Sequence, residues 1–466
     1  QRKIRLQEHS TAGICFSAQD VIGLSSKDNS KIDVFISFSP QATCMCKLKG
    51  CPYLNIEEFY DPDVFLISDE PMLEYQATIF KEMDNLLQEE IHEFKTFDFN
   101  PAQYYSFFLK VLSDMIFRAS VSLSHLMISS GISHIYFFSP EQQQIDDTLF
   151  IGNNVYKNCL PLFCNTYGVK YTMLQPTKTA IGIDKTAKNN IRKFLRKCKR
   201  TLKNFLVPSH VPHTDYLVFK PGYDVDYVVE IFRNNKFPVV SFESILNIRE
   251  IEKQANDILP GLYKTKNSLY RFLQETRFFV WAGVDCFSVV QPYFDYWYDR
   301  IIPRMYGSFI TARNFFKRRR PSAVFLFSPW EVIDFGVLAA AENLNIPRIL
   351  YQHGGFEGVC EYTCYDITEL RQCDYRFVYG NSVADYFNER KSKLKGKLAE
   401  LVPVGSARLD KLKMRMYDGK SIREKIRIPD NKTIVFYIPT SYQYHWYMCR
   451  EAYLSCSYFE FLYKLC

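Results

Sequence analysis

Two short apolar runs separated by one helical pattern lie within residues 323–351, and no other segment constrains the fold of this chain as much. The runs cover residues 323–327 and 348–351, and the helical pattern covers residues 331–343. Parallel strands of one sheet need a crossover connection, which is usually an α-helix. The segment therefore predicts a strand, a crossover helix and a second, parallel strand.

A polar, glycine-rich loop follows the second strand and reads Gln352, His353, Gly354 and Gly355. Open α/β sheets bind their ligands at the carboxyl ends of the strands. Glycine lets the backbone approach a ligand closely, and histidine has a free pKa near neutrality. We expect Gln352, Gly354 and Gly355 to form a substrate loop and His353 to be the catalytic residue. The alternative is a strand-end turn whose histidine only bonds a backbone carbonyl.

Two carboxylates, Glu357 and Glu361, follow this loop closely. A carboxylate can orient an imidazole that acts as a general base, or it can bind substrate hydroxyls. We therefore group both glutamates with His353 as catalytic candidates.

Short apolar runs alternate with helical patterns over much of the chain. Further strands are expected at residues 134–139, 169–174, 216–219, 237–242, 375–379 and 401–404. Strands that alternate with helices predict an α/β fold with a doubly wound parallel sheet.

We divide the chain into three parts. Residues 1–130 are interpreted as an N-terminal arm, a first strand and a helical region, and residues 131–425 as a Rossmann-like domain. Residues 426–466 are interpreted as the start of a truncated second Rossmann-like domain, because a complete one needs on the order of 100 residues. The chain starts at Gln1 and stops in an aromatic run, so we expect both ends to be cut.

Composition narrows the class of protein. A hydrophobic content of 47% in 466 residues can fill real cores and excludes a disordered chain. The net charge of +7 is modest for this length and does not suggest nucleic acid as a partner. The 14 cysteines suggest reduced thiols, and thus a cytoplasmic location, more than a disulfide framework. No run of about 18 apolar residues is present, so no membrane span is expected.

Several segments together resemble a known family. In order they read AAENLNIP, a strand, QHGG, a strand that ends in Gly380, VPVGSARLD and IVFYIPTS. This order is similar to that of two-Rossmann-domain (GT-B) transferases of bacterial surface and capsular polysaccharides, including the CDP-glycerol glycerophosphotransferases. The likeness covers residues 323–441.

The resemblance implies transfer from a nucleotide-activated donor, UDP- or CDP-linked, to a glycan or lipid-linked acceptor in a cleft between two domains. It further implies that residues 131–425 form the acceptor-side domain and that His353 is the catalytic residue. It also implies donor or phosphate binding by Gly405, Ser406, Arg408, Thr440 and Ser441. Because the chain contains only the start of the donor-side domain, we expect little activity from this chain alone.

Neither a cofactor nor a metal site is expected. Asp224 and Asp226 have the spacing of a metal-binding pair, but they open a predicted helix, where aspartate is a routine cap. The clusters Cys44, Cys46, Cys51 and Cys360, Cys364, Cys373 lack the paired CxxC units of structural zinc sites.

Three interpretations stay open at this stage. Residues 185–203 form a basic, amphipathic helical pattern that suits either an anionic membrane surface, on the inner face of the plasma membrane, or a solvated helix packed on its domain. For the whole chain, the alternatives to a transferase are a nucleotide-sugar 2-epimerase-like isomerase and a non-catalytic α/β binding scaffold.

Overall fold

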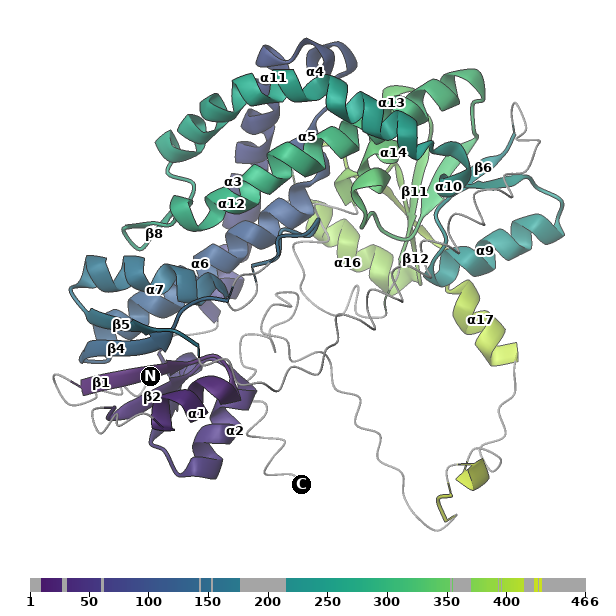
Figure 1. Ribbon diagram of the computed structural model, residues 1–466. Helices are drawn as coiled ribbons and strands as arrows, with labels where there is room; N and C mark the ends of the chain where they lie inside the picture. The colour runs from purple at the N-terminus through teal and green to yellow at the C-terminus, as the bar shows by residue number, and fades with distance from the viewer. Residues whose placement is uncertain are drawn as a thin grey trace.

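The computed structural model describes residues 10–26, 32–59, 63–141, 144–151, 154–176, 215–352, 354, 370–392, 394, 396–414, 423–425 and 427–429. The fold is α/β, and its two large sheets are wholly parallel. The expected doubly wound parallel sheet is therefore confirmed, and the described chain contains two of them (Figure 1).

Sheet A is built from the first third of the chain, in the strand order β3-β2-β1-β4-β5. Its strands are β1 (Ser10–Cys15), β2 (Val34–Ser37), β3 (Tyr53–Asn55), β4 (Ile132–Phe138) and β5 (Lys170–Leu174). Helices α1 (Ala18–Ser26) and α2 (Pro40–Lys49) connect the first three strands, and α7 (Asn154–Tyr167) connects the last two.

Side chains of β1 alternate between two cores, as expected for a strand buried on both faces. Ala12 and Ile14 join the large core that contains residues of α7, whereas Cys15 packs with Val21 and Leu24 of α1. Helices therefore cover both faces of sheet A.

Sheet B has the strand order β13-β12-β11-β10-β6-β7. Its strands are β6 (Leu217–Phe219), β7 (Val239–Ser241), β10 (Ala323–Leu326), β11 (Arg348–Tyr351), β12 (Tyr375–Val378) and β13 (Glu400–Pro403). Helix α9 (Tyr223–Asn234) packs on one face, and α14 (Val332–Asn343) and α16 (Asn381–Lys391) pack on the other. Helix α17 (Ala407–Met414) follows β13.

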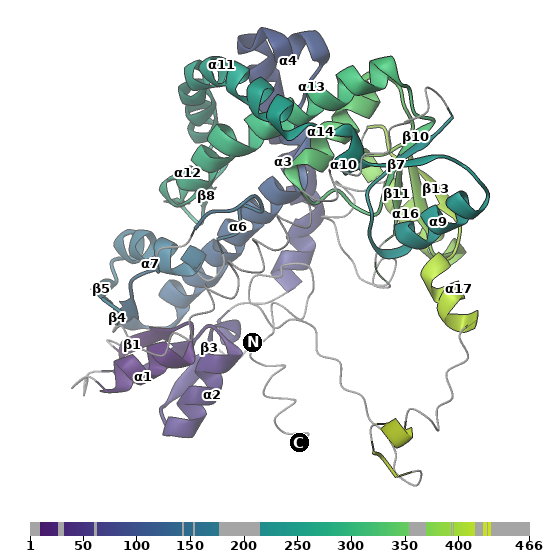
Figure 2. The same cartoon turned by 45° about the vertical axis from the view of Figure 1, so that its right-hand side comes forward.

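A helical layer joins the two sheets and comes from two long insertions (Figures 1 and 2). The first, between β3 and β4, contains α3 (Asp63–Glu90), α4 (His92–Phe97), α5 (Pro101–Tyr104) and α6 (Ser106–Ser129). The second, between β7 and β10, contains α10 (Phe242–Ile245), α11 (Ile248–Glu275), the hairpin of β8 (Val280–Trp281) and β9 (Val284–Asp285), α12 (Phe287–Tyr296), a π-helix (Trp297–Ile301) and α13 (Ile302–Arg318).

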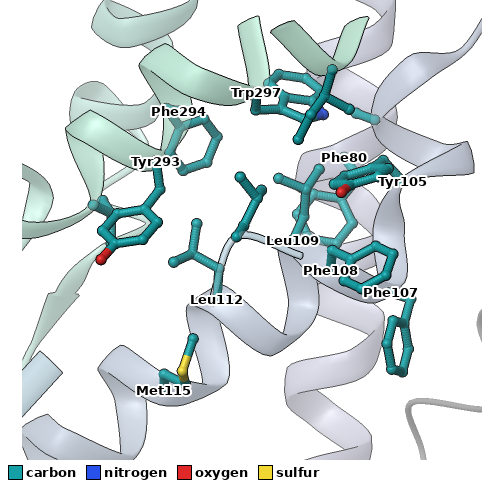
Figure 3. Close-up of a cluster of buried hydrophobic side chains, with 14 of the residues drawn as sticks. Phe80, Tyr105, Phe107, Phe108, Leu109, Leu112, Met115, Tyr293, Phe294 and Trp297 are labelled. Carbon is teal, nitrogen blue, oxygen red and sulfur yellow. The ribbon is translucent and has the colours of Figure 1, made fainter. Parts of the chain in front are cut away.

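The two insertions share one core. Leu109 and Leu112 of α6 face Phe294 of α12 and Trp297 of the π-helix, and Phe80 of α3 lies beside them (Figure 3). Figure 3 also shows that this core is rich in aromatic rings, which explains part of the 16% aromatic content. Helix α6 is long and apolar enough to span a membrane, but 67% of its most apolar window is buried inside the fold, as in a core helix.

Close helix approach in this layer depends on two glycines. A Cβ on Gly336 of α14 would lie 2.5 Å from the carbonyl oxygen of Met305, and a Cβ on Gly307 of α13 would lie 2.3 Å from that of Ile251. Helices α11, α13 and α14 can therefore pack this closely against one another only because both positions lack a side chain.

The strand pairing differs from the expected division of the chain. Residues 131–425 were expected to form one Rossmann-like unit, but β4 pairs with β1 of sheet A and β5 pairs with β4, and neither strand pairs with β6. Strand β1 lies within the segment interpreted as the N-terminal arm, for which no strand was expected. Of the expected second domain at 426–466, only residues 427–429 are among those described.

Candidate functional site at the carboxyl edge of sheet B

The chain of sheet B reverses its direction of winding between β6 and β10. It runs from β6 outward to β7, and then continues from β10 on the other side of β6. The crevice outside the carboxyl ends of two such strands is the usual ligand site of an open α/β sheet. This rule places the candidate site among the loops after β6, β10, β11, β12 and β13.

Lys220 and Asp334 form a buried ion pair between β6 and β10, at the switch point where the winding of sheet B reverses. The Lys220 ammonium contacts the Asp334 carboxylate and lies 3.7 Å from Glu331 Oε2. Asp334 Oδ2 also accepts the backbone N–H groups of Trp330 (2.9 Å) and Glu331 (2.8 Å), so the carboxylate caps α14. Burial raises the pKa of Asp334, although Lys220 and these N–H groups oppose the shift.

Sheet A has a similar lysine–aspartate pair where its own winding reverses, between β1 and β4. Asp20 Oδ2 accepts the N–H groups of Phe16 (2.8 Å) and Ser17 (3.1 Å) at the start of α1. The Lys157 ammonium lies 4.0 Å from Asp20 Oδ1. At both switch points a lysine therefore pairs with an aspartate. In each case that aspartate also caps the helix that follows a central strand.

Asp224, the second residue of α9, joins three loops of the candidate site. Its side chain is fully buried. Oδ1 accepts hydrogen bonds from Ser406 Oγ (2.6 Å) and the Arg408 backbone N–H (2.8 Å), and Oδ2 accepts one from the Tyr379 hydroxyl (2.7 Å). Arg408 Nε lies 3.8 Å from Oδ2. We call Asp224, Tyr379, Ser406 and Arg408 the Asp224 cluster.

The capping role that the sequence suggested for the aspartate pair belongs to Asp226, whose Oδ1 accepts the Gly222 N–H at 3.1 Å. Asp224 instead reaches across the sheet edge. Burial raises the pKa of Tyr379, and the nearby Asp224 carboxylate raises it further. The Tyr379 hydroxyl is therefore protonated at neutral pH and donates to Asp224.

Gln352 holds the loop after β11 against the loop after β12. Its side chain is 1% exposed, Nε2 donates to the Gly354 carbonyl at 2.7 Å, and Oε1 accepts the Tyr379 N–H at 2.7 Å. The Tyr351 hydroxyl donates to the Gly405 carbonyl at 2.7 Å and so adds the loop after β13. These bonds fix the relative positions of three strand ends.

The structure brings together five of the residues expected at the site. Gln352, Gly354, Gly405, Ser406 and Arg408 all lie at the carboxyl edge of sheet B. The other expected residues lie outside the described residues: His353, Gly355, Glu357, Glu361, Thr440 and Ser441. The basic segment 185–203 also lies outside them.

Sequence reasoning missed Tyr379, Lys220 and the role of Asp224. Each follows or lies just after a strand of sheet B, so strand-end position was the signal that could have found them. Within the described residues, no group of three or more His, Cys, Asp or Glu side chains is arranged to hold a metal ion.

The Asp224 cluster has few free donors for an anion. The Ser406 hydroxyl and the Arg408 N–H both donate to Asp224, and the Gly405 N–H donates to the Val378 carbonyl at 3.3 Å. The partly exposed Arg408 guanidinium is the cation that this cluster offers to a ligand.

Comparison of the chain with protein-family models, with curated proteins and with solved structures gave no match.

Proposed function

We propose that this protein is a GT-B-type transferase of cell-surface polysaccharide synthesis that works at the carboxyl edge of sheet B. One observation supports the proposal above the others. Three of the segments that carry the sequence resemblance lie side by side there and are joined by hydrogen bonds through Gln352, Tyr379 and Ser406. Segments that resembled a family only by their order in the chain thus meet at one edge of the sheet.

In this proposal the donor is a UDP- or CDP-linked sugar and the acceptor is a glycan or a lipid-linked saccharide. His353 removes the proton of the acceptor hydroxyl, with Glu357 and Glu361 as supporting carboxylates. The Arg408 guanidinium stabilises the charge that develops on the departing phosphate. Thr440 and Ser441 would add donors to the same phosphate. Such a reaction needs no cofactor beyond the activated donor.

A non-catalytic binding scaffold is the second candidate, and one observation favours it. The Ser406 hydroxyl and the Arg408 N–H are already bonded to Asp224, so they are not open to donor phosphate in this structure. A scaffold would keep the Asp224 cluster as a purely structural link between strands.

Hydrogen exchange separates these candidates without requiring turnover. UDP- and CDP-linked sugars are added to the purified chain, and amide protection is measured over residues 351–354, 379–381 and 405–411. We expect protection at all three segments, with a loss of at least tenfold in affinity for Arg408→Gln. Lys411→Gln is the matched control, because Lys411 lies on the same helix and its exposed ammonium pairs with Glu230 at 2.7 Å.

Transfer is then measured by mass spectrometry with membrane-extracted saccharide acceptors. His353→Ala should lower the rate by about 10²–10⁴, the usual contribution of a general base. His92→Ala, on the exposed surface of α4, should leave it unchanged. Donor turnover without any acceptor would indicate an epimerase. Since little turnover is expected from this chain alone, the absence of donor-induced protection is the result that would favour the scaffold and refute the transferase proposal.

A further inference from the structure

A cavity of about 420 Å³ lies where the helical layer meets sheet B. Its walls come from α3, α4, α5, α13 and α14 and from the residues just before β12. Glu342, near the end of α14, and Gln372, which precedes β12, place it at the amino edge of sheet B. It is therefore distinct from the candidate site at the carboxyl edge. Its volume lies within the range of small-molecule sites, about 300–1,000 Å³.

The cavity combines aromatic side chains with an unusual number of amides. Phe80, Phe97 and Phe309 supply the apolar surface. The amides are Asn100, Gln103, Asn343 and Gln372. An amide side chain presents both a donor and an acceptor, which is also what a hydroxyl group presents. Asn100 and Asn343 already bond within the protein through both ends of their amides, whereas the Gln372 oxygen has no partner. A molecule with C–H faces and hydroxyls would contact the rings and bond to that oxygen.

Three polar atoms of the wall residues have unmet hydrogen-bonding capacity, and one of them is the donor Arg371 Nε. Ser106 Oγ and Gln372 Oε1 are buried without a hydrogen-bond partner, and each residue is only 4% exposed. The Gln372 amide is held in place by its other end, where Nε2 donates to the Tyr104 carbonyl at 2.6 Å. A buried polar group without a partner costs about 1–3 kcal/mol. A ligand that bonds to these atoms would recover that cost.

Each charged residue of the wall already has a partner within the protein, and only Nε of Arg371 is left without a hydrogen bond. Glu342 accepts from the Tyr104 hydroxyl and pairs with Arg348 at 3.0 Å. Arg371 pairs with Glu74 at 3.1 Å. Asp98 Oδ1 accepts from Gln88 at 3.1 Å. A charged ligand would have to compete with these bonds, so the wall favours a neutral one.

We propose that this cavity binds a neutral, polyhydroxylated molecule of monosaccharide size. The site is separate from the carboxyl edge of sheet B, so the inference does not rest on the proposed transferase function. Because Ser106 belongs to α6 and Gln372 lies just before β12 of sheet B, a bound sugar would link the helical layer to the sheet.

The test uses calorimetry on the full chain with glucose, galactose, N-acetylglucosamine and myo-inositol, and with glucosamine and glucuronic acid as charged comparators. For a ligand of about 12 heavy atoms we expect a Kd on the order of 1 mM. Ala77→Phe places a ring in the cavity from a partly exposed position on α3 and should abolish binding. Thr78→Phe, the next residue and exposed, is its matched control.

Ser106→Ala decides the outcome even if the larger substitution disturbs the fold. It removes a hydroxyl that has no partner, so thermal stability without ligand should be unchanged or higher, while sugar affinity should fall about fivefold. Three results would overturn the proposal: no saturable binding of any neutral probe, tighter binding of a charged comparator, or binding that is unaffected by Ser106→Ala and by a folded Ala77→Phe variant.

Discussion

Replacing Asp224 tests how the carboxyl edge of sheet B is held together. Its carboxylate accepts three hydrogen bonds, from Ser406, Arg408 and Tyr379, and it has no exposed surface. Bonds to a charged group contribute about 1.5–3 kcal/mol each, and removing one partner of a buried charged pair costs about 3–5 kcal/mol. We therefore expect Asp224→Ala to lower the free energy of unfolding by about 3–5 kcal/mol.

Asp224→Asn should behave differently, because its remaining oxygen can face Ser406 and Arg408. The Tyr379 hydroxyl can then rotate and accept from the new amide, so all three contacts survive at a cost of about 1 kcal/mol. This contrast depends on the hydrogen-bond pattern and not on side-chain volume.

Two assays measure the effect. Urea unfolding, followed by circular dichroism, gives the change in stability, and hydrogen exchange gives the local opening of residues 405–411. A double-mutant cycle with Tyr379→Phe isolates the Asp224–Tyr379 term, which should show a coupling of at least about 1 kcal/mol. If Asp224→Ala cost less than 0.5 kcal/mol, or if Asn and Ala were equally damaging, the assignment of Asp224 as the link between the strand ends would be wrong.

The remaining predictions concern the helical layer. Gly336→Ala should destabilise the protein by about 1–3 kcal/mol or more through overpacking, since the new Cβ would lie 2.5 Å from the Met305 carbonyl oxygen. Gly261→Ala on α11, whose Cβ would meet nothing closer than 3.9 Å, should instead stabilise by up to about 1 kcal/mol; equal thermal shifts for the two variants would contradict the packing argument. Asp84 accepts the Ala102 and Gln103 N–H groups, yet burial raises its pKa to about 8. Since the folded state then holds this proton more tightly than the unfolded state, stability should fall by up to about 1.4 kcal/mol per pH unit as pH rises from about 4 to about 8. Asp84→Asn should flatten that part of the pH profile, and an unchanged slope in the variant would show that another group is responsible.

Local sequence patterns were sufficient for the strands of sheet B and for the position of the loops after them. Apolar runs closed by glycine or polar residues predicted β10, β11, β12 and β13 to within a residue or two. These strands are short, and β10 and β11 are largely buried, so their apolar pattern can be recognised without knowing the partner strands. Strand-end position also predicted that Gln352 would lie at the carboxyl edge of the sheet, whereas Gly405 and Ser406 were expected near it from the family resemblance.

Two elements lacked such a pattern. Strand β1 (STAGIC) contains small and polar residues, and it is central in its sheet only because β2 and β4 cover both of its edges. Helix α3 contains Pro71 and many acidic residues, which weakened its helical signal.

The sequence by itself determined that this chain forms parallel sheets wound with helices, because hydrophobic periodicity is a property of neighbouring residues. Only the tertiary structure decided which strands share a sheet, since β4 lies 117 or more residues from β1 along the chain but only one strand away in space. It also decided the partners of Asp224, which lie 155 to 184 residues away. Pairing and burial over such separations depend on how whole layers pack, and no local pattern encodes them.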